Sequence, residues 1–566
     1  MSNELTRIDN ADFKLYESMV ICSSQWAAVG DALGWITELA AQGDSSVKYR
    51  TGQKKVDRTI PWKRFISGKN GPRVDLNAGT YSDDTQLRLS VCRAIRGDGS
   101  FDVEAFSKIE VTVWPAYALG AGIGTKAAAN NLSKKNVAWF SNFFQKGESQ
   151  YINGGGNGAA MRIQPHVWAS RDLNHVVLNV MKDSVVTHGH THGFCGAIFH
   201  ALTLFYTLNN KKIPNLESLK SFISVIQKVP LILKTDFQLA SFWLPTWERN
   251  TGKSFQEAID EVCFEVEENI EKIIKIENKK GAELYRTILE EFGCHIPKYR
   301  GSGLKTALAA SVLAAVSQEE PIESVLTWIV NELDIDTDTI ATMFGAIVGA
   351  LENRSPEWDL QDREYITFEA RRLAKIAYGE KESSFDYPDP SRWLPPTNQS
   401  SAVIKTLNGL SLRGLGELKP ISETYEQGNF VWQWFSLPHG QTVLAKYKKN
   451  IEVTDSKELA IHGDNKKYSE EKIVEIKNSP EPKQPELGFG GDHIDKETLL
   501  KKYEQESSQF GIIDRYTDEV IHSNFQNEVI GYYFNKLIEE SLSLDNAIAF
   551  SAIIAKAKLA RIKRGK

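Results

Sequence analysis

Cysteine is scarce in this sequence, and the few cysteines lack the spacing of a bridge or a metal site. The 566 residues include five cysteines and no CxxC pair. They stand at Cys22, Cys92, Cys195, Cys263 and Cys294. An odd, scattered set of this kind excludes a disulfide framework and a cysteine zinc site, and it favours a reducing cytoplasm as the location of the protein.

Long apolar runs and an excess of positive charge are also missing. No segment approaches the roughly 18 apolar residues that a membrane span needs. The first residues, MSNELTRIDNADFKLYES, show no basic-then-apolar secretion signal. The net charge of −6 excludes a molecule that binds nucleic acid through its overall charge. What remains is a globular composition, 41% hydrophobic and 25% charged, and 566 residues predict several domains.

The first 395 residues carry a mainly helical pattern. Apolar residues recur at three- and four-residue spacing in 20–42, 85–97, 191–208 and 306–316. Residues 254–292 predict one or two amphipathic helices with charged outer faces, inside a helical insertion at about 210–300. We therefore expect a catalytic or binding domain over 14–395 in which buried helices dominate.

The pattern changes after residue 395. Residues 396–450 predict a small β-containing module, with a hairpin formed by 428–438 and 440–449 around the break LPHG. Residues 451–492 are charged and rich in Pro and Gly, which is typical of a linker. Residues 493–566 turn helical again and carry six Lys or Arg in the last eleven positions. Such a basic tail can contact nucleic acid or an acidic membrane surface, and a solvated basic helix end is the alternative.

Two short acidic clusters carry most of the chemical information. Ser82-Asp83-Asp84-Thr85 and Asp336-Thr337-Asp338-Thr339 each stand where an irregular stretch enters an apolar helix. One interpretation is helix capping, because Asp, Ser and Thr oxygens accept hydrogen bonds from the free N–H groups of a first turn. Capping needs only one such residue, however, and adjacent carboxylates repel one another unless a cation or a proton lies between them.

If the two clusters face each other, their four carboxylates and neighbouring hydroxyls converge without any nitrogen or sulfur ligand. Such an oxygen-only set suits Mg²⁺ or Mn²⁺ and does not suit zinc. Four acids exceed what one Mg²⁺ usually takes from a protein, which favours a pair of ions about 3.5–4 Å apart. The spacing alone leaves this pair of ions and two separately capped helices as alternatives.

A helix face and a glycine-rich loop add weaker signals. In GDALGWITE, Asp31 and Glu38 lie two helical turns apart beside two glycines, so both are predicted on one face that a ligand can approach. The stretch GGGNGAAMR at 154–162 matches a dinucleotide fingerprint, but no buried strand precedes it, so that interpretation fails. Its exposed N–H groups can still surround a phosphate. The alternatives are a solvated helix face and a plain glycine turn.

Four of the eleven histidines fall in VVTHGHTHGFCGAIFH, at His188, His190, His192 and His200. Residues at i and i+2 on a helix point apart, and no acid stands within this stretch. We therefore expect a loop that enters a helix, with at most His188 facing a ligand.

Taken in order, these segments resemble the ADP-ribosylglycohydrolase family, typified by dinitrogenase-reductase activating glycohydrolase. The family pattern is GDxxGxxxE, then [ST]DDT, a GNGAAMR-like loop, a TH segment, and DTDT before a helix of small residues. Here these motifs read GDALGWITE, YSDDTQL, GGGNGAAMRI, VTHGHTHG and DIDTDTIATMFGAIVGA. Five motifs in the right order over about residues 20–395 make the resemblance highly specific.

The resemblance implies an all-α, orthogonal helical bundle with a two-ion site between helices. By motif position, the ligands of two Mg²⁺ or Mn²⁺ ions would be Ser82, Asp83, Asp84, Asp336, Asp338 and Thr339. Glu38 would match the mobile acidic residue near the scissile bond. The ADP-ribose pocket would be lined by His188 and, with the glycines under the diphosphate, by Gly154, Gly155, Gly156 and Asn157.

Such an enzyme would hydrolyse the ribosyl C1″ bond and remove ADP-ribose from a protein, a nucleic acid or a small molecule. A carboxylate is needed to stabilise positive charge on the sugar, and the leaving atom needs a proton. Glu38 and Asp84 are the candidates, and the sequence does not decide which is acid and which is base. The alternative is a non-catalytic ADP-ribose or nucleotide-binding module in an interaction or defence protein. That alternative predicts a missing ligand or a missing glutamate, and the motifs here contain them all.

The sequence departs from the family pattern in two respects. Asp334 and Ile335 stand just before DTDT, where the family usually has glycines, and Asp334 brings another negative charge near the cluster. The insertion at about 210–300 and everything beyond about 395 have no counterpart in the motif set. We expect these additions to set the substrate.

Overall fold

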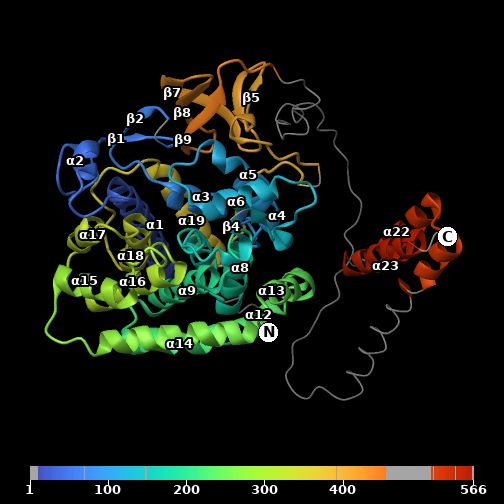
Figure 1. The fold of residues 1–566 in the computed structure, drawn as a ribbon, viewed down its shortest axis with the longest axis horizontal. Coiled ribbons are helices and arrows are strands. Elements are labelled where there is room, and N and C mark those ends of the chain that lie inside the picture. Colours follow the sequence, from blue (N-terminus) through green and yellow to red (C-terminus); the bar gives the residue numbers. More distant parts are fainter. Residues whose placement is uncertain are drawn as a thin grey trace. The chain divides into compact units, whose positions relative to one another are not determined.

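The computed structural model of this protein describes residues 10–68, 71–146, 149–390, 392–453, 512–513, 515–541 and 544–563. The chain divides into two compact units, residues 1–471 and residues 472–566. The first unit is a helical body that carries a small antiparallel sheet (Figure 1). This confirms the predicted all-α body with an added β-containing module.

The helical body consists of long helices joined by short ones. The long helices are α1 (Asn10–Thr37), α3 (Asp83–Ala94), α6 (Ile123–Leu132), α8 (Leu173–Val185), α9 (Thr191–Asn210), α13 (Leu244–Thr251), α14 (Phe255–Ile274), α15 (Gly281–Phe292), α16 (Gly303–Val316), α17 (Ile322–Asn331), α18 (Thr337–Gly349) and α19 (Arg363–Ala377). The short helices are α2 (Ser46–Thr51), α4 (Val103–Ala105), α5 (Val111–Val113), α7 (Gln164–Trp168), α10 (Leu216–Ser221), α11 (Ile223–Ile226) and α12 (Val229–Leu233). Single 3-10 and π turns are η1 (Phe106–Glu110), η2 (Trp114–Ala116), η3 (Trp139–Ser141), η4 (Tyr151–Asn153), η5 (Leu239–Trp243) and η6 (Gln399–Ser401).

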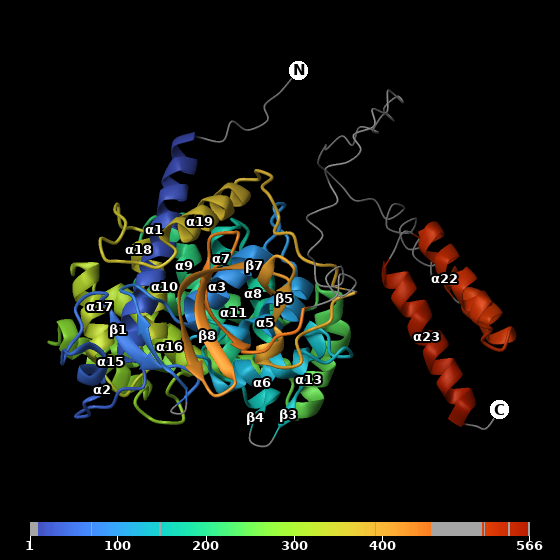
Figure 2. The same ribbon diagram turned by 90° about the horizontal axis from the view of Figure 1, so that it is seen from above.

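At the centre of the body, α1 and α18 run side by side, as both views show (Figures 1 and 2). A β-carbon at Gly30 would lie 2.3 Å from the carbonyl oxygen of Ala341, and one at Gly34 would lie 2.4 Å from the Cα of Asp338. No side chain fits at these distances, so the glycines let the two backbones touch. The end of α1 is thereby placed against the first turn of α18.

The sheet contains five antiparallel strands in sequence order. They are β5 (Val403–Thr406), β6 (Gly409–Leu412), β7 (Gly416–Gln427), β8 (Phe430–Ser436) and β9 (Thr442–Lys448). β8 and β9 pair over their whole length, which confirms the predicted hairpin. Phe435 and Val443 form one apolar cluster with Ile109 and Trp114 of the helical body, so the sheet packs directly on that body.

Two short hairpins occur within the helical body. β1 (Trp62–Phe65) pairs with β2 (Arg73–Leu76), and β3 (Gln145–Lys146) pairs with β4 (Ser149–Gln150). The β1–β2 hairpin follows α2 and contacts it, which brings these strands close to the end of α1.

The predicted insertion at about 210–300 is helical and comprises α10 to α15. The sequence predicted one or two amphipathic helices over residues 254–292, and the structure has two, α14 and α15. α14 buries an apolar stripe that includes Phe255, Ile259 and Val266 and exposes charged residues on its other side. It lies along the edge of the body opposite the sheet (Figure 1).

The second unit contains α22 (Asn527–Ser541) and α23 (Leu544–Lys563), whose apolar cluster includes Leu537 and Phe550. The predicted linker lies outside the described residues from position 454 onward, as do the last three residues of the basic tail. Among the helices that the structure describes, none has the length and apolar character to cross a membrane. The five cysteines are buried and unpaired, in agreement with the prediction.

Candidate active site

The first turn of α3 is fastened to α1 by Asp31. The buried carboxylate of Asp31 accepts hydrogen bonds from the backbone N–H groups of Ser82, at 3.0 Å, and Thr85, at 2.8 Å. Both donors belong to the start of a helix, where N–H groups lack partners within the helix. Asp31 therefore supports the start of α3, and Glu38 lies one residue beyond the end of α1.

The two acidic clusters meet in space. Thr339 Oγ1 donates a hydrogen bond to Asp84 Oδ1 at 3.4 Å, although 255 residues separate the two. Ser82 and Asp336 are also the N-caps of α3 and α18, each accepting a hydrogen bond from a backbone N–H group. The helix-capping interpretation and the clustering interpretation are therefore both correct. The two capped helix starts bring their acidic side chains together.

The carboxyl groups of the two clusters share a buried and strongly acidic environment. Burial, together with the charges of Glu38 and Asp31, raises the pKa of Asp83 to about 8. Burial also raises the pKa of Asp84 and of Asp338 well above the usual range, and the other acids of the cluster add to this effect. Like charges at such proximity are stabilised by a proton or by a cation.

The donor atoms of the cluster fit a hard divalent cation. Asp84 Oδ2 is buried and accepts no hydrogen bond from the residues that the structure describes, whereas buried carboxylate oxygens nearly always have a partner. The residues around it offer carboxylate and hydroxyl oxygens, which are the ligands that Mg²⁺ and Mn²⁺ prefer. Within the described ranges, no three carboxylate, imidazole or thiol groups are grouped closely enough to hold one ion between them. The oxygen donors of a hard-ion site are thus present.

Glu38 lies at the edge of the cluster and is held by two arginines. Arg64 of β1 forms an ion pair with it, Nη2 to Oε2 at 3.0 Å, and lies over the ring of Trp35 at 5.2 Å. Arg50 donates hydrogen bonds to the backbone carbonyls of Ile36 and Glu38, each at 2.8 Å. Burial nevertheless raises the pKa of Glu38, with Arg64 opposing it. No sequence motif pointed to either arginine, because the pairs depend on how the β1–β2 hairpin and α2 fold against α1.

Asp334 adopts the backbone conformation that a glycine of the family pattern would adopt at this position. Its φ is 66°, the left-handed region that glycine occupies without strain and that Asp tolerates. Its carboxylate accepts a hydrogen bond from the N–H of Gln42 at 3.0 Å. The additional carboxylate therefore binds the backbone of the segment that follows α1.

The glycine-rich loop and the acidic cluster open into one cavity of about 400 Å³. The lining includes Asp83, Asp336, His188 and residues 154–158, so the expected substrate-binding residues Gly154, Gly155, Gly156 and Asn157 lie together with two of the expected metal ligands. The other four expected ligands are buried. They are Ser82, Asp84, Asp338 and Thr339.

The glycine-rich loop is held by its backbone. Asn157 N–H donates to the carbonyl of Gly301 at 2.9 Å, and Gly303 N–H donates to the carbonyl of Gly155 at 2.9 Å. Both partners belong to the segment that leads into α16. The loop is therefore fixed to the body while the glycines leave its cavity side free of side chains.

His188 is oriented by a chain of buried hydrogen bonds. Arg162 pairs with Asp183 at 2.8 Å and donates to Thr187 Oγ1 at 2.9 Å, and Thr187 Oγ1 lies 2.7 Å from His188 Nδ1. Burial and the charge of Arg162 lower the pKa of His188 to about 3, so the ring is neutral. The Thr187 hydroxyl thus links His188 Nδ1 to Arg162, and its proton can serve Nδ1 in the tautomer that carries the ring proton on Nε2.

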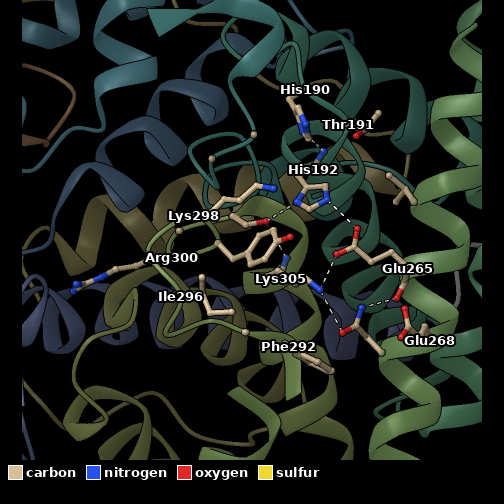
Figure 3. A pocket seen from close by; sticks show the side chains of 18 of the residues that line it. His190, Thr191, His192, Glu265, Glu268, Phe292, Ile296, Lys298, Arg300 and Lys305 are labelled. Carbon is tan, nitrogen blue, oxygen red and sulfur yellow. Dashed lines mark hydrogen bonds and ion pairs between the residues drawn. The ribbon is translucent and has the colours of Figure 1, made fainter. Parts of the chain in front are cut away.

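A second, larger cavity of about 800 Å³ adjoins the first across the glycine loop. The two share Asn153, Gly155, Gly156 and Gly301. Figure 3 shows that the start of α9, the helix α14 and the segment 293–302 surround this larger cavity. Helices of the insertion thus contribute directly to the surroundings of the site.

Histidine, glutamate and lysine side chains join at the base of the larger cavity (Figure 3). His192 Nε2 lies 3.0 Å from Glu265 Oε2, and Lys305 Nζ lies 2.7 Å from Glu265 Oε1. No acid stands among these histidines in the sequence, but the fold brings Glu265 of α14 to His192 from 73 residues away. His190 caps α9 by accepting a hydrogen bond from the N–H of His192, as expected of a loop that enters a helix. Both histidines also line the larger cavity, whereas the sequence predicted that at most His188 would face a ligand.

Sequence reasoning missed the contribution of α14. Glu265 and Asn269 lie on a helix whose pattern is that of any amphipathic helix, and nothing local marks them as cavity residues. Only the packing of the insertion against α9 and α16 reveals them.

The chain is similar to known proteins. A model of the ADP-ribosylglycohydrolase family matches residues 27–382. The chain is similar to the ADP-ribosylhydrolase ARH3 of Xenopus tropicalis, with 24% identity over 352 residues that cover 60% of this chain and 89% of that protein. It is also similar to a solved ADP-ribosylglycohydrolase-related protein complex, with 18% identity and a TM-score of 0.41, over 64% of this chain and 99% of that one.

The range that the family model matches contains all five motifs, the acidic cluster and the two adjoining cavities. It also spans most of the helical body. The chain therefore belongs to the ADP-ribosylglycohydrolase family.

Proposed function

We propose that this protein is a divalent-metal-dependent hydrolase that cleaves the ribosyl C1″ bond of ADP-ribose conjugates on a macromolecule. Family membership supports hydrolysis of ADP-ribosyl bonds. The observation that carries the proposal is the meeting of the first turns of α3 and α18 beside the glycine-rich loop, in one cavity.

In this proposal two Mg²⁺ or Mn²⁺ ions are held by Ser82, Asp83, Asp84, Asp336, Asp338 and Thr339. When bound, such a pair of ions supplies positive charge that fixes the ribose hydroxyls and polarises an attacking water. Asp31 contributes by holding the start of α3 in place. Gly30 and Gly34 contribute by allowing α1 to lie against α18.

The reaction breaks the bond from C1″ to the leaving nitrogen or oxygen. Water adds OH to C1″ and the leaving atom gains a proton, while positive charge builds on the sugar. Glu38 is 22% exposed in its side chain, whereas Asp84 is 2% exposed. Because the acid must exchange its proton with solvent in each turnover, we assign proton donation to Glu38 and stabilisation of the sugar cation to Asp84.

Substrate binding follows from the cavity lining. The N–H groups of the glycine loop and the Nε2–H donor of His188 suit the oxygens of a diphosphate. The larger cavity beyond the loop provides room for the rest of the ADP-ribose moiety.

Release of ADP-ribose tests the proposal directly. Peptides modified on arginine or serine and a modified oligonucleotide are incubated with the protein and Mg²⁺, with and without EDTA. We expect release from at least one substrate, abolished by EDTA. Asp83→Asn and Asp338→Asn are each expected to lower the rate more than about 100-fold, since each removes a charged ligand oxygen.

Asp334→Asn is the matched control, because it makes the same chemical change beside the cluster and Asn also tolerates positive φ. It should keep nearly full activity. Binding of ADP-ribose in calorimetry without turnover of any substrate would contradict the proposal and support a non-catalytic binding module.

A further inference from the structure

A third cavity, of about 480 Å³, lies where the sheet meets the helical body. Its lining includes Lys126 of α6, Lys446 and Lys448 of β9, and the partly exposed ring of Phe430. The remaining lining side chains that the structure describes are mostly amides and hydroxyls, and none is a carboxylate. The whole chain has 73 acidic and 67 basic residues, so a cavity lined by three lysines and no acid departs from the average surface.

The lysines of this cavity keep their charge unpaired within the described part of the chain. Lys446 Nζ lies over the rings of Phe430, at 4.4 Å, and Trp432, at 4.9 Å. The neighbouring Lys449, outside the cavity, pairs with Glu426 at 2.7 Å, whereas among the described residues no carboxylate pairs with the three lysines of the cavity. Lys446 is thus held by aromatic rings with its charge available to an anion.

The cavity is connected to the candidate active site by α6. Thr125 lines the cavity of the glycine loop, and Lys126, the next residue of the same helix, lines the lysine cavity. One helix therefore forms part of the wall of both.

We propose that the lysine cavity binds a nucleotide unit of single-stranded nucleic acid. The phosphates lie among the three lysines, and the base lies against Phe430. Lysine charge combined with an exposed aromatic ring is the combination that holds single strands, since phosphates require cations and every base has a face that can stack. The amide and hydroxyl side chains of the lining supply donors and acceptors for the sugar and the base edge. This site goes beyond the proposed hydrolase activity and does not depend on it.

Fluorescence anisotropy tests this site with the full-length protein and fluorescein-labelled 12-nucleotide oligo(dT) and oligo(U). Lys446→Gln and Lys448→Gln are each expected to weaken binding about fivefold and to lower the salt dependence by about 0.7 in slope, the value for one phosphate contact of a single strand. Phe430→Ala is expected to weaken binding about tenfold through loss of base stacking.

Lys419→Gln is the matched control. It removes the same charge from β7 of the same sheet, at an exposed position that does not line the cavity. Its binding should stay within about twofold of that of the unchanged protein. The basic C-terminal tail is present in every variant, so its contribution cancels from the comparison.

Several outcomes would overturn the assignment. These are absence of oligonucleotide binding, an equal loss for Lys419→Gln and Lys446→Gln, and unchanged affinity of Phe430→Ala. Displacement of the oligonucleotide by equal concentrations of AMP would assign the cavity to a free nucleotide, and displacement by inorganic pyrophosphate would assign it to an anion without a base. Asp83→Asn should bind the oligonucleotide normally, so failure of this site and failure of the hydrolase proposal are distinguishable.

Discussion

The ion pair between Arg64 and Glu38 fixes the position of the proposed proton donor. Arg64 is itself held over Trp35, so it is a rigid support for the carboxyl group. Arg64→Ala should lower kcat about 10- to 100-fold, because a displaced acid loses its alignment with the leaving atom. ADP-ribose affinity, measured by calorimetry, should change less than about twofold. Arg64→Lys should recover part of the rate.

Lys63→Ala is the control for Arg64→Ala. Lys63 is on the same strand and forms an exposed ion pair with Asp75 at 2.6 Å. The Lys63→Ala variant should keep an unchanged kcat, since exposed ion pairs contribute little to the stability of the fold. Equal losses of kcat for Lys63→Ala and Arg64→Ala would show that the hairpin fold, and not the ion pair, matters.

Glu265 gives a pH dependence of stability. Burial alone would raise its pKa, but hydrogen bonds from His192 and Lys305 outweigh burial and lower the pKa to about 2. A lowered folded-state pKa stabilises the fold above the unfolded value near 4.5 and loses that stabilisation as the pH falls toward 2. Glu265→Gln should therefore be less stable by on the order of 2 kcal/mol at pH 7, with the gap narrowing below pH 4.5.

Urea unfolding at pH 7, 4.5 and 3.5 measures this gap. Glu268→Gln is the control, because Glu268 is on the same helix and its pair with Lys272 is exposed. A constant gap for Glu265→Gln across the three pH values would contradict the prediction.

At the scale of elements, the contact between α1 and α18 positions the acidic cluster. A β-carbon at Gly34 would lie 2.4 Å from the Cα of Asp338, so Gly34→Ala must push the helices apart. We expect a loss of about 1–3 kcal/mol in unfolding free energy and of about 100-fold in activity. Thermal unfolding and ADP-ribose release measure the two effects.

Gly531→Ala separates this effect from helix propensity. Gly531 is in α22, and a β-carbon added there would meet no atom of the described residues within 4 Å, so alanine should be neutral or stabilising at this position. Normal activity of Gly34→Ala would show that the contact between α1 and α18 can widen without displacing the acidic cluster.

Local motifs predicted the helix starts and the hairpin, but they did not predict the side chains that hold these elements together around the site. Ser82 and Asp336 begin helices as their residue types require, and the aromatic and β-branched residues of 428–449 form the expected hairpin. Arg64 and Glu265 could not be predicted, because each reaches its partner through an ion pair between separate elements. Asp31 was visible as an acid near glycines, but its bonds to the start of α3 depend on tertiary packing.

At the scale of the whole molecule, the sheet is joined to the helical body by an apolar contact. The buried residues of the sheet pack against Ile109, Trp114 and Met161 of the helical body. A chain cut after residue 395 would expose that surface, and each large side chain returned to water costs about 1.5–3 kcal/mol. We expect this chain to melt well below the full-length protein or to aggregate.

A chain cut after residue 471 should behave differently. Residues 472–566 form a compact unit of their own, so their removal should leave the melting temperature of the first unit and its ADP-ribose release unchanged. Thermal unfolding and size-exclusion chromatography compare the two truncations. Similar instability of both would place the domain boundary elsewhere.

The backbone contact at Gly30 and Gly34 also bears on how such a chain can diverge. Where main chains touch directly, the separation of the two acid-bearing segments does not depend on the size of the side chains that surround them. Substitutions can accumulate through the rest of the interior while a few glycines preserve the spacing. A contact of this kind would keep the two acidic segments in place while the side chains around it change.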